Sequence, residues 1–292
     1  MDAEQGISGH AHMVCLLGNP TGHSLSPAIH NLSFELLGIN ATYLCFDVDN
    51  ADLGNIVAAF KAMEGWDGLN VTMPCKQAII EHLYSLDEAA GLIGAVNVVS
   101  KSDDGHAIGH NTDGLGFMVS LAEGGVHAEG ARMVLLGPGG AGSAILAQAA
   151  LDGVAHIDVF GRAEGKSFLP AQELIERVVA QTDCGVELHD LSNTDELASC
   201  IQAADILVNA TSVGMGEGCT DTPVPQSLLK PGMAVADIVY HPRETQLLRD
   251  AKALGCTTVP GLGMLLAQAA ASEAIWYGAE MPADEIASRL FN

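Results

Sequence analysis

Residues 132–153 read RMVLLGPGGAGSAILAQAALDG, and this stretch carries the strongest indication of a fold. It begins as an apolar, strand-like run, passes through a glycine-rich turn and ends as a helical pattern. Glycine allows a sharp turn and a close approach of the backbone to a pyrophosphate, which then binds at the helix N-terminus. A glycine pattern alone is a weak indication, but here the strand before it and the helix after it are both readable. The stretch therefore predicts a dinucleotide-binding loop at Gly137, Gly139, Gly140, Ala141 and Gly142.

Short apolar runs and longer helical patterns alternate on both sides of this stretch, which is typical of parallel βαβ units. Before it, strands are expected at 12–18, 42–48 and 68–73, helices at 26–38, 55–63 and 75–83, and a hairpin from 95–100 and 106–112. After it, strands are expected at 156–162, 204–211, 233–240 and 256–261, with helices at 169–181 and 262–278. The chain is thus expected to be an α/β protein, and its 292 residues suit two domains.

Composition excludes some classes of partner. The chain carries 12 Lys and Arg against 36 Asp and Glu, a formal charge of −24, which argues against nucleic acid or an anionic membrane as a partner. Its 7 cysteines are scattered without a CxxC pair, as expected for reduced thiols in a cytoplasm. No apolar run approaches the ~18 residues of a membrane span, and the acidic start MDAEQG does not resemble a signal peptide. A cytoplasmic protein is expected.

The end of the strand after the loop selects the cofactor. It reads VFGRAEGKSF, where a plain acidic residue would indicate NAD. Arg162 and Lys166 could hold a 2′-phosphate, whereas Glu164 could accept a hydrogen bond from a free 2′-hydroxyl. A solvated loop is the ordinary alternative for such a charge run. Because direct contact outweighs charges that solvent screens, both NAD and NADP are expected to bind, with NAD modestly preferred.

A second group of polar residues precedes the glycine-rich loop. Ser24 and Ser26 stand in the turn GNPTGHSLSPAIHN, Lys76 ends GLNVTMPCK, Asn97 lies in GAVNVV and Asp113 in GHNTDGLGF. Each has an ordinary interpretation, because serines cap helices, an asparagine pairs at a sheet edge and NTDG forms turns. Together they supply what the oxidation of a hydroxyl requires: a group that takes the proton as hydride leaves, and others that fix the geometry.

In these segments the chain resembles the shikimate dehydrogenase family over nearly its whole length. The resemblance rests on GNPTGHSLSPAIHN, NVTMPCK, GAVNVV, NTDG, LLGPGGAGSA, NATSVGM and GLGMLLAQAA, in this order. The segments HSLSP, FDVDN, LPAQELIERVVAQTDC and IWYGAEMP are most similar to the quinate/shikimate dehydrogenase branch. The resemblance implies an NAD(P)-dependent oxidoreductase of the chorismate pathway of aromatic amino acid biosynthesis. Such an enzyme would oxidise shikimate, quinate or both to the 3-dehydro ketone, as a monomer or a homodimer.

The same resemblance implies roles for individual residues. Lys76 matches the catalytic lysine and Asp113 its partner aspartate, both contacting the hydroxyl that is oxidised. Ser24 and Ser26 match serines that bind the substrate carboxylate. Further substrate contacts are implied at Tyr43, Thr72, Asn97, Tyr240 and Gln268, and cofactor contacts at Thr211, Ser212, Val239 and Gly261.

The resemblance also implies a division of the chain. Residues 1–112 would form the substrate domain, 113–261 a Rossmann-type NAD(P)-binding domain, and 262–292 a C-terminal segment whose helix returns to the first domain. Two positions depart from the family pattern. Pro138 replaces a usual alanine and offers no N–H to a phosphate, and Gly161 replaces the asparagine of an Asn-Arg pair. Both departures concern the choice of cofactor and not the chemistry.

Two rival functions remain open at this point. An enzyme of the methylenetetrahydrofolate dehydrogenase type would have similar architecture, but its lysine stands in a Tyr-x-x-x-Lys setting, and position 72 is Thr here. A catalytically silent, nicotinamide-binding regulator should have lost Lys76 or Asp113, and both are present. No metal site is expected, since His10, His12, His23 and His30 follow no ligand spacing, and Cys75 is expected to be a buried packing residue.

Overall fold

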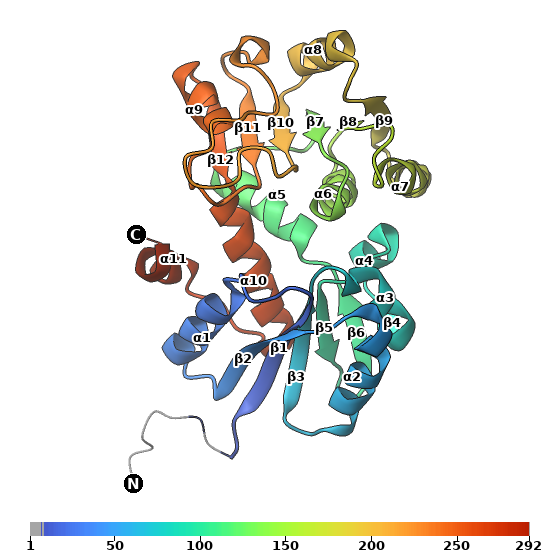
Figure 1. Cartoon of the computed structure of the whole chain (residues 1–292), viewed down its shortest axis with the longest axis vertical. Helices are drawn as coiled ribbons and strands as arrows, with labels where there is room; N and C mark the ends of the chain where they lie inside the picture. Colours follow the sequence, from blue (N-terminus) through green and yellow to red (C-terminus); the bar gives the residue numbers. More distant parts are fainter. Residues whose placement is uncertain (1–6, 8, 292) are drawn as a thin grey trace. The chain divides into compact units, whose positions relative to one another are not determined.

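The computed structural model describes residue 7 and residues 9–291. They form two compact units, one comprising the described residues up to Thr112 and from Ala269 onward, the other Asp113–Gln268. Each unit is built on its own six-stranded sheet (Figure 1). The α/β fold expected from the alternating pattern is confirmed.

The sheet of the first unit has the strand order β2-β1-β3-β5-β6-β4. Its strands are β1 (His12–Gly18), β2 (Ala41–Asp47), β3 (Trp66–Val71), β4 (Ser85–Leu86), β5 (Val98–Lys101) and β6 (Ala107–His110). β1 pairs in parallel with β2 and β3, whereas β5 runs antiparallel to β3 and β6. The expected hairpin is therefore present, and it places Asn97 directly before β5.

Helices cover both faces of this sheet. They are α1 (Ser26–Leu37), α2 (Asn50–Ala62), α3 (Cys75–Ala78), the 3-10 helix η1 (Ile79–His82), α4 (Glu88–Ile93), the end of α10 (Gly261–Tyr277) and α11 (Ala283–Phe291). Side chains alternate between the faces along β1, as in any strand. Cys15 and Leu17 pack in one core with residues of α2 and α3, and Val14 and Leu16 in another with residues of α1 and α10.

The sheet of the second unit is parallel throughout, in the order β12-β11-β10-β7-β8-β9. Its strands are β7 (Arg132–Leu136), β8 (His156–Gly161), β9 (Gly185–Asp190), β10 (Ile206–Asn209), β11 (Ala234–Asp237) and β12 (Thr257–Pro260). The helices of this unit are α5 (Asp113–Glu123), α6 (Gly140–Leu151), α7 (Phe168–Gln181), α8 (Thr194–Ala203), η2 (Gln226–Leu228), α9 (Gln246–Ala253) and the start of α10. The strand order reverses between β7 and β10, the point where parallel sheets of this kind bind ligands.

Several elements differ from the sequence-based expectation: β4, α4 and α11 were not expected, and two further differences have a physical reason. The helix expected over 75–83 is a single α-turn, α3, followed by η1. Cys75 and Ile79 are buried in this segment, and Ala78, Ile80 and Leu83 pack against the same core. The apolar side chains therefore pack as a helix would place them, but the second turn has 3-10 geometry. Strand β9, GVELHD, was not expected at all. The alternation of polar and apolar residues in β9 is short and begins soon after α7 ends at Gln181, so the pattern does not clearly separate the strand from the helix.

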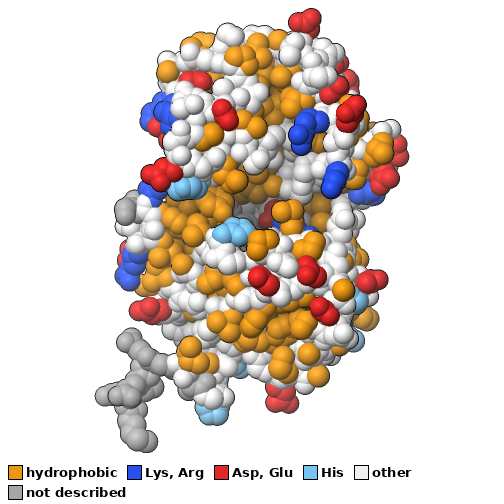
Figure 2. Space-filling view, viewed as in Figure 1, with side chains coloured by type: hydrophobic (Ala, Val, Ile, Leu, Met, Phe, Trp, Pro, Cys, Tyr) orange, Lys and Arg blue, Asp and Glu red, His pale blue; other side chains and the backbone are white. Residues whose placement is uncertain are grey.

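The surface gives little guidance to function. On the face drawn in Figure 2, the described acidic side chains are scattered and do not form one patch. Among the described residues, no helix has both the length and the apolar character needed to cross a membrane.

Candidate active site

The loop between β1 and α1 is anchored by a carboxylate. Thr21 donates both its backbone N–H and its hydroxyl to Asp47 Oδ1, each at 2.7 Å, and these bonds lower the pKa of the Asp47 carboxyl. Ser24 N–H donates to the Thr21 carbonyl at 3.0 Å, and Ser24 Oγ accepts the N–H of Ser26 at 3.2 Å. The two serines thus stand at the start of α1 on a loop with a fixed position. The capping interpretation applies in part to Ser24, whose oxygen accepts that N–H.

Behind this loop lies a fully buried aromatic and polar network. The Ser26 side chain hydrogen-bonds the Tyr43 phenol, whose hydroxyl donates to Asn70 Oδ1 at 2.7 Å. Burial raises the pKa of Tyr43 well above its ordinary value, so the phenol stays neutral. The ring of His30 stacks on that of Tyr43 at 4.6 Å, and His30 Nδ1 lies 2.7 Å from Glu273 Oε1. Tyr43 is only 1% exposed, so its contacts support Ser26 more directly than they line a binding surface.

Lys76 lies on a turn that hydrogen bonds hold in place. Cys75 N–H donates to the Thr72 carbonyl at 2.8 Å, and Cys75 Sγ donates to the Val48 carbonyl at 3.3 Å. The Lys76 carbonyl accepts the N–H of Val96, also at 2.8 Å. The backbone on both sides of Lys76 is therefore fixed, and its side chain is half-buried. Most lysines are solvated, so this placement favours a chemical role.

Asn97 joins β5 to the end of the first unit. Its side-chain Nδ2 donates to Thr112 Oγ1 at 3.0 Å, and its Oδ1 accepts the Thr112 N–H at 2.8 Å. The Asn97 carbonyl accepts the Val71 N–H and a hydrogen bond from Asn70 Nδ2. Since Thr112 directly precedes Asp113 in the chain, Asn97 fixes the backbone from which Asp113 projects.

The glycine-rich loop of the second unit is closely packed. Gly137 has φ of +93°, a conformation that suits glycine alone. A Cβ added at Gly142 would lie 2.0 Å from the Gly137 carbonyl oxygen. Helix α6 begins at Gly140, with Gly139 as its N-cap. The loop therefore has the narrow geometry that a pyrophosphate site needs.

Replacement of Gly142 by alanine is expected to open this loop. The new methyl group must displace the Gly137 backbone, and overpacking of this kind costs about 1–3 kcal/mol. The dissociation constant for NADP+, measured by calorimetry, should rise about 10- to 100-fold. The control is Gly91→Ala in α4, where a Cβ meets no atom within 4 Å. Equal affinity in the two variants would show that the loop does not depend on Gly142.

A cavity of about 1170 Å³ opens beside this loop. Its lining contains six of the expected cofactor residues, namely Gly137, Gly139, Arg162, Glu164, Thr211 and Ser212. The remaining ones, Gly140, Ala141, Gly142, Val239 and Gly261, lie in the same unit but do not line it. Arg162, Glu164 and Lys166 are all exposed at its rim. The charge run is thus a solvated loop that also borders the cavity.

Pro138 and Gly161 both line this cavity, and the ring of Pro138 lies where a side chain at position 161 would stand. A Cβ at Gly161 would lie 2.8 Å from Pro138 Cγ and 3.3 Å from the Phe168 ring. A side chain at position 161 would therefore collide with the proline ring. The two departures from the family pattern are thus coupled, because Pro138 fills the volume that a residue at 161 would need.

A buried carboxylate links the ends of β10 and β11. Asp237 Oδ1 accepts hydrogen bonds from Asn209 Nδ2 at 2.9 Å and from the Val239 N–H at 3.0 Å. Asp237 Oδ2 accepts the Thr245 hydroxyl at 2.7 Å, and Asn209 Oδ1 accepts the Thr211 N–H and hydroxyl. Burial raises the pKa of Asp237, although these bonds oppose the shift. The network fixes the segments that begin at Thr211 and Val239.

Three further expected residues of the second unit are Tyr240, Gly261 and Gln268. Tyr240 is exposed and follows Val239, which is buried. Gly261 starts α10, and a Cβ there would lie 2.4 Å from the Ile238 carbonyl oxygen. Gln268 lies on α10, where its Nε2 donates to the Leu265 carbonyl at 3.0 Å.

Comparison with known proteins agrees with these features. The family model for the shikimate dehydrogenase substrate binding domain matches residues 16–99. Shikimate dehydrogenase (NADP(+)) of Listeria monocytogenes is 42% identical over 288 residues, which cover 98% of this chain and 97% of the relative. The chain belongs to the shikimate dehydrogenase family.

Solved structures of the family have the same fold. Shikimate 5-dehydrogenase of Listeria monocytogenes, in complex with shikimate and NAD, has a TM-score of 0.95, with 41% identity and 99% of each chain covered. Quinate dehydrogenase of Corynebacterium glutamicum, in complex with NAD, has a TM-score of 0.85 at 31% identity and covers 95% of this chain and 98% of that one.

Three polar residues of the second unit, Asp190, Asn209 and Asp237, were not among the site residues predicted from the sequence. Asp190 lines the cavity, and the Ser192 hydroxyl and N–H, with the Ala163 N–H, hold the pKa of its carboxyl below the usual value. Asn209 and Asp237 form the network between β10 and β11. The signal that could have found Asn209 and Asp237 is a polar residue at the carboxyl end of an otherwise apolar strand. Asp190 gave no such signal, because β9 also contains Glu187 and His189.

Proposed function

We propose that this chain is an NAD(P)-dependent dehydrogenase that reversibly oxidises a ring hydroxyl of shikimate to the ketone. The observation that carries the proposal is the similarity to a shikimate dehydrogenase over 98% of the chain. The sequence resemblance adds the assignment of Lys76 and Asp113 as the acid–base pair. A bound nicotinamide dinucleotide supplies the hydride acceptor. The Lys76 amine takes the proton of the substrate hydroxyl. Asp113, the partner of Lys76, contacts the same hydroxyl.

The test is the absorbance of reduced nicotinamide when the full chain receives shikimate or quinate with NAD+ or NADP+. We expect turnover of shikimate with at least one cofactor. A folded protein without turnover in all four mixtures would contradict the proposal and favour the silent regulator. The methylenetetrahydrofolate type would need its own substrate, and Thr72 already counts against it.

Quinate is proposed as a second substrate. The support is the resemblance of HSLSP and FDVDN to the quinate/shikimate branch and the likeness to a quinate dehydrogenase structure. Turnover of shikimate without turnover of quinate would limit the chain to the first substrate.

Within the proposed site, Ser24 and Ser26 bind the substrate carboxylate. Each hydrogen bond to a charged group is worth about 1.5–3 kcal/mol, so the double variant Ser24→Ala/Ser26→Ala should raise KM for shikimate at least 10-fold. The turnover number should change little, because the carboxylate is remote from the hydride. Ser102→Ala, in the turn between β5 and β6, serves as a control. An unchanged KM in the double variant would leave the serines as capping residues.

Either dinucleotide is proposed as cofactor. The cations Arg162 and Lys166 border the cavity, but so do two carboxylates, Glu164 and Asp190. The NADP(+) in the name of the Listeria relative gives no support to a preference for NAD. The proposal is therefore the use of both, with Glu164 accepting from the free 2′-hydroxyl of NAD.

Glu164→Ala is expected to shift specificity toward NADP. The variant loses an acceptor for the 2′-hydroxyl and a charge that repels a 2′-phosphate, so the ratio of kcat/KM for NADP+ over NAD+ should rise about three- to tenfold. Glu173→Ala, an exposed carboxylate of α7, removes the same charge and should leave the ratio unchanged. Equal ratios in the two variants would mean that Glu164 points to solvent.

A further inference from the structure

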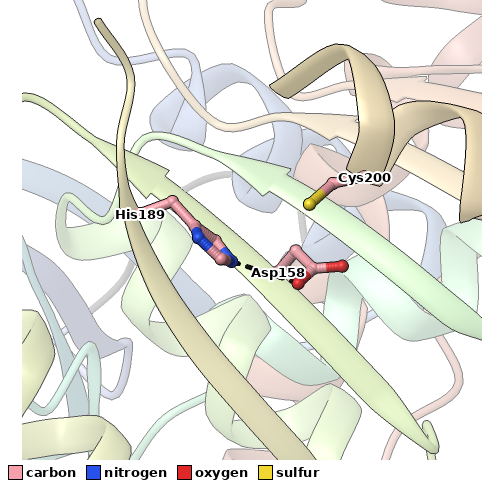
Figure 3. Close-up of side chains that lie close together, drawn as sticks. All are labelled: Asp158, His189 and Cys200. Atoms are coloured by element: carbon pink, nitrogen blue, oxygen red, sulfur yellow. Dashed lines mark hydrogen bonds and ion pairs between the residues drawn. The ribbon is translucent and has the colours of Figure 1, made fainter. Parts of the chain in front are cut away.

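A cluster of metal-ligating side chains lies between β8, β9 and α8 of the second unit. Asp158, His189 and Cys200 each offer one ligand atom, and these atoms lie within 4.8 Å of one another. Figure 3 shows His189 and Cys200 converging on Asp158 from β9 and α8. His189 Nε2 is 3.1 Å and His156 Nε2 3.0 Å from Asp158 Oδ1. Asp158 and His189 are buried, so this is not a solvated surface group.

The charges around the cluster are arranged as in a metal site. His189 Nδ1 lies 3.0 Å from Glu196 Oε1, which leaves Nε2 directed at Asp158. A carboxylate on the outer nitrogen is the usual partner of a metal-binding histidine, because it fixes the tautomer and the ring. Arg132 contacts only the second oxygen, Asp158 Oδ2, at 3.4 Å. Oδ1 is therefore the oxygen that faces the other ligands.

We propose that Asp158, His189 and Cys200 bind a zinc-class divalent cation. One nitrogen, one sulfur and one carboxylate oxygen, with a water as the fourth ligand, suit tetrahedral Zn²⁺ or Co²⁺. An Asp carboxylate and a Cys thiolate would together neutralise the two charges of the ion, which lowers the cost of burying it. Its ligands come from β8, β9 and α8, so the role of the ion would be structural. It would tie edge strand β9 to β8 and α8.

The site adjoins the nucleotide cavity without being part of it. The ring of Phe160 stacks on that of His189 at 4.8 Å, and Phe160 also lines the cavity. His189 directly precedes Asp190, another lining residue. A bound ion would therefore brace one wall of that cavity. This inference is independent of the substrate proposed above.

Without a metal, the cluster must satisfy a different set of hydrogen bonds. His189 then lies within hydrogen-bond distance of a carboxylate at each ring nitrogen. The Cys200 thiol would donate to Asp158, and burial with the two nearby carboxylates raises the pKa of Cys200 to about 11. This ion-pair network is the alternative that the experiment must exclude.

The test is titration of the metal-stripped full chain with Zn²⁺ and with Co²⁺. We expect one equivalent of Zn²⁺ to bind in calorimetry, and Co²⁺ to give the visible bands of a tetrahedral ion with a sulfur-to-metal charge-transfer band. Cys200→Ser should abolish the charge-transfer band and His189→Gln should weaken binding. Glu196 is not a ligand but contacts the outer nitrogen of His189, Nδ1. Glu196→Gln should therefore weaken metal binding about 10- to 100-fold.

Cys256→Ser is the matched control, because Cys256 and Cys200 are both partly buried against the same core. It should leave the spectrum and the affinity unchanged. Circular dichroism of each variant separates loss of ligand from loss of fold. No stoichiometric binding, or equal binding by wild type and Cys200→Ser, would overturn the proposal and leave the cluster as an ion-pair network.

Discussion

Lys76→Ala is expected to lower kcat for shikimate oxidation by roughly 10²–10⁴, the range typical of a lost general acid–base group. KM should change less, because the lysine acts on the hydroxyl that reacts while Ser24 and Ser26 hold the carboxylate. The loss should appear equally in kcat and in kcat/KM, as for an interaction made only in the transition state. Initial rates with saturating cofactor, over a range of shikimate concentrations, measure both quantities.

Two further variants separate chemistry from packing. Lys76→Met keeps an unbranched apolar stem but has no amine, so it should lose as much activity as Lys76→Ala. Lys101→Ala removes an exposed lysine at the end of β5 and should retain full activity. Recovery of most of the turnover in Lys76→Met would assign Lys76 to packing and remove it from the mechanism.

The sequence predicted best where a feature depends on neighbouring residues. The loop after β7 was readable because strand, glycines and helix follow one another within residues 132–153. The hairpin of β5 and β6 and the glycine that ends α1, Gly38 with φ of +67°, are local in the same sense. In each case backbone geometry is dictated by residues a few positions apart.

The parts that escaped the sequence depend on tertiary pairing. β9 is an edge strand of six residues, and its assignment comes from pairing with β8. Asp190 and His189 lie on it, so this part of the cavity wall and the proposed metal-ligand cluster were both missed. Asn209 and Asp237 were overlooked because two polar residues on separate strands become a pair only when β10 and β11 lie side by side.

Glu273 is the residue that sequence reasoning had least chance of finding, since its partner His30 is 243 positions away. It lies on α10, whose sequence LGMLLAQAAASEAIWYG predicts a helix with a continuous apolar face. Its side chain is fully buried, and Oε2 accepts the Ser33 hydroxyl while Oε1 pairs with His30 Nδ1. The ring of His30 in turn supports Tyr43, and Tyr43 holds Ser26. Glu273 thus stabilises the first unit and, through His30 and Tyr43, supports the position of Ser26, a proposed substrate-binding residue.

Glu273→Ala should lower the free energy of unfolding of the first unit by about 3–5 kcal/mol, the usual cost of removing one partner from a buried pair. Urea unfolding followed by tryptophan emission measures it, because Trp66 and Trp276 both belong to that unit. Glu285→Ala breaks an exposed pair with Arg289 on α11 and should cost no more than about 1 kcal/mol.

The double variant Glu273→Leu/His30→Leu decides whether the cost comes from the lost pair or from the polar group left behind. When both partners of a buried pair are replaced by apolar residues, stability is often unchanged or increased. We expect the double variant to be clearly more stable than Glu273→Leu alone, in which His30 and Ser33 remain buried without their acceptor. KM for shikimate should nevertheless be higher in the double variant than in the wild type, because a leucine cannot stack on Tyr43 as the imidazole does. Ser33 loses its acceptor in both variants, so a double variant as unstable as the single one would show that the orphaned His30 imidazole is not the source of the cost.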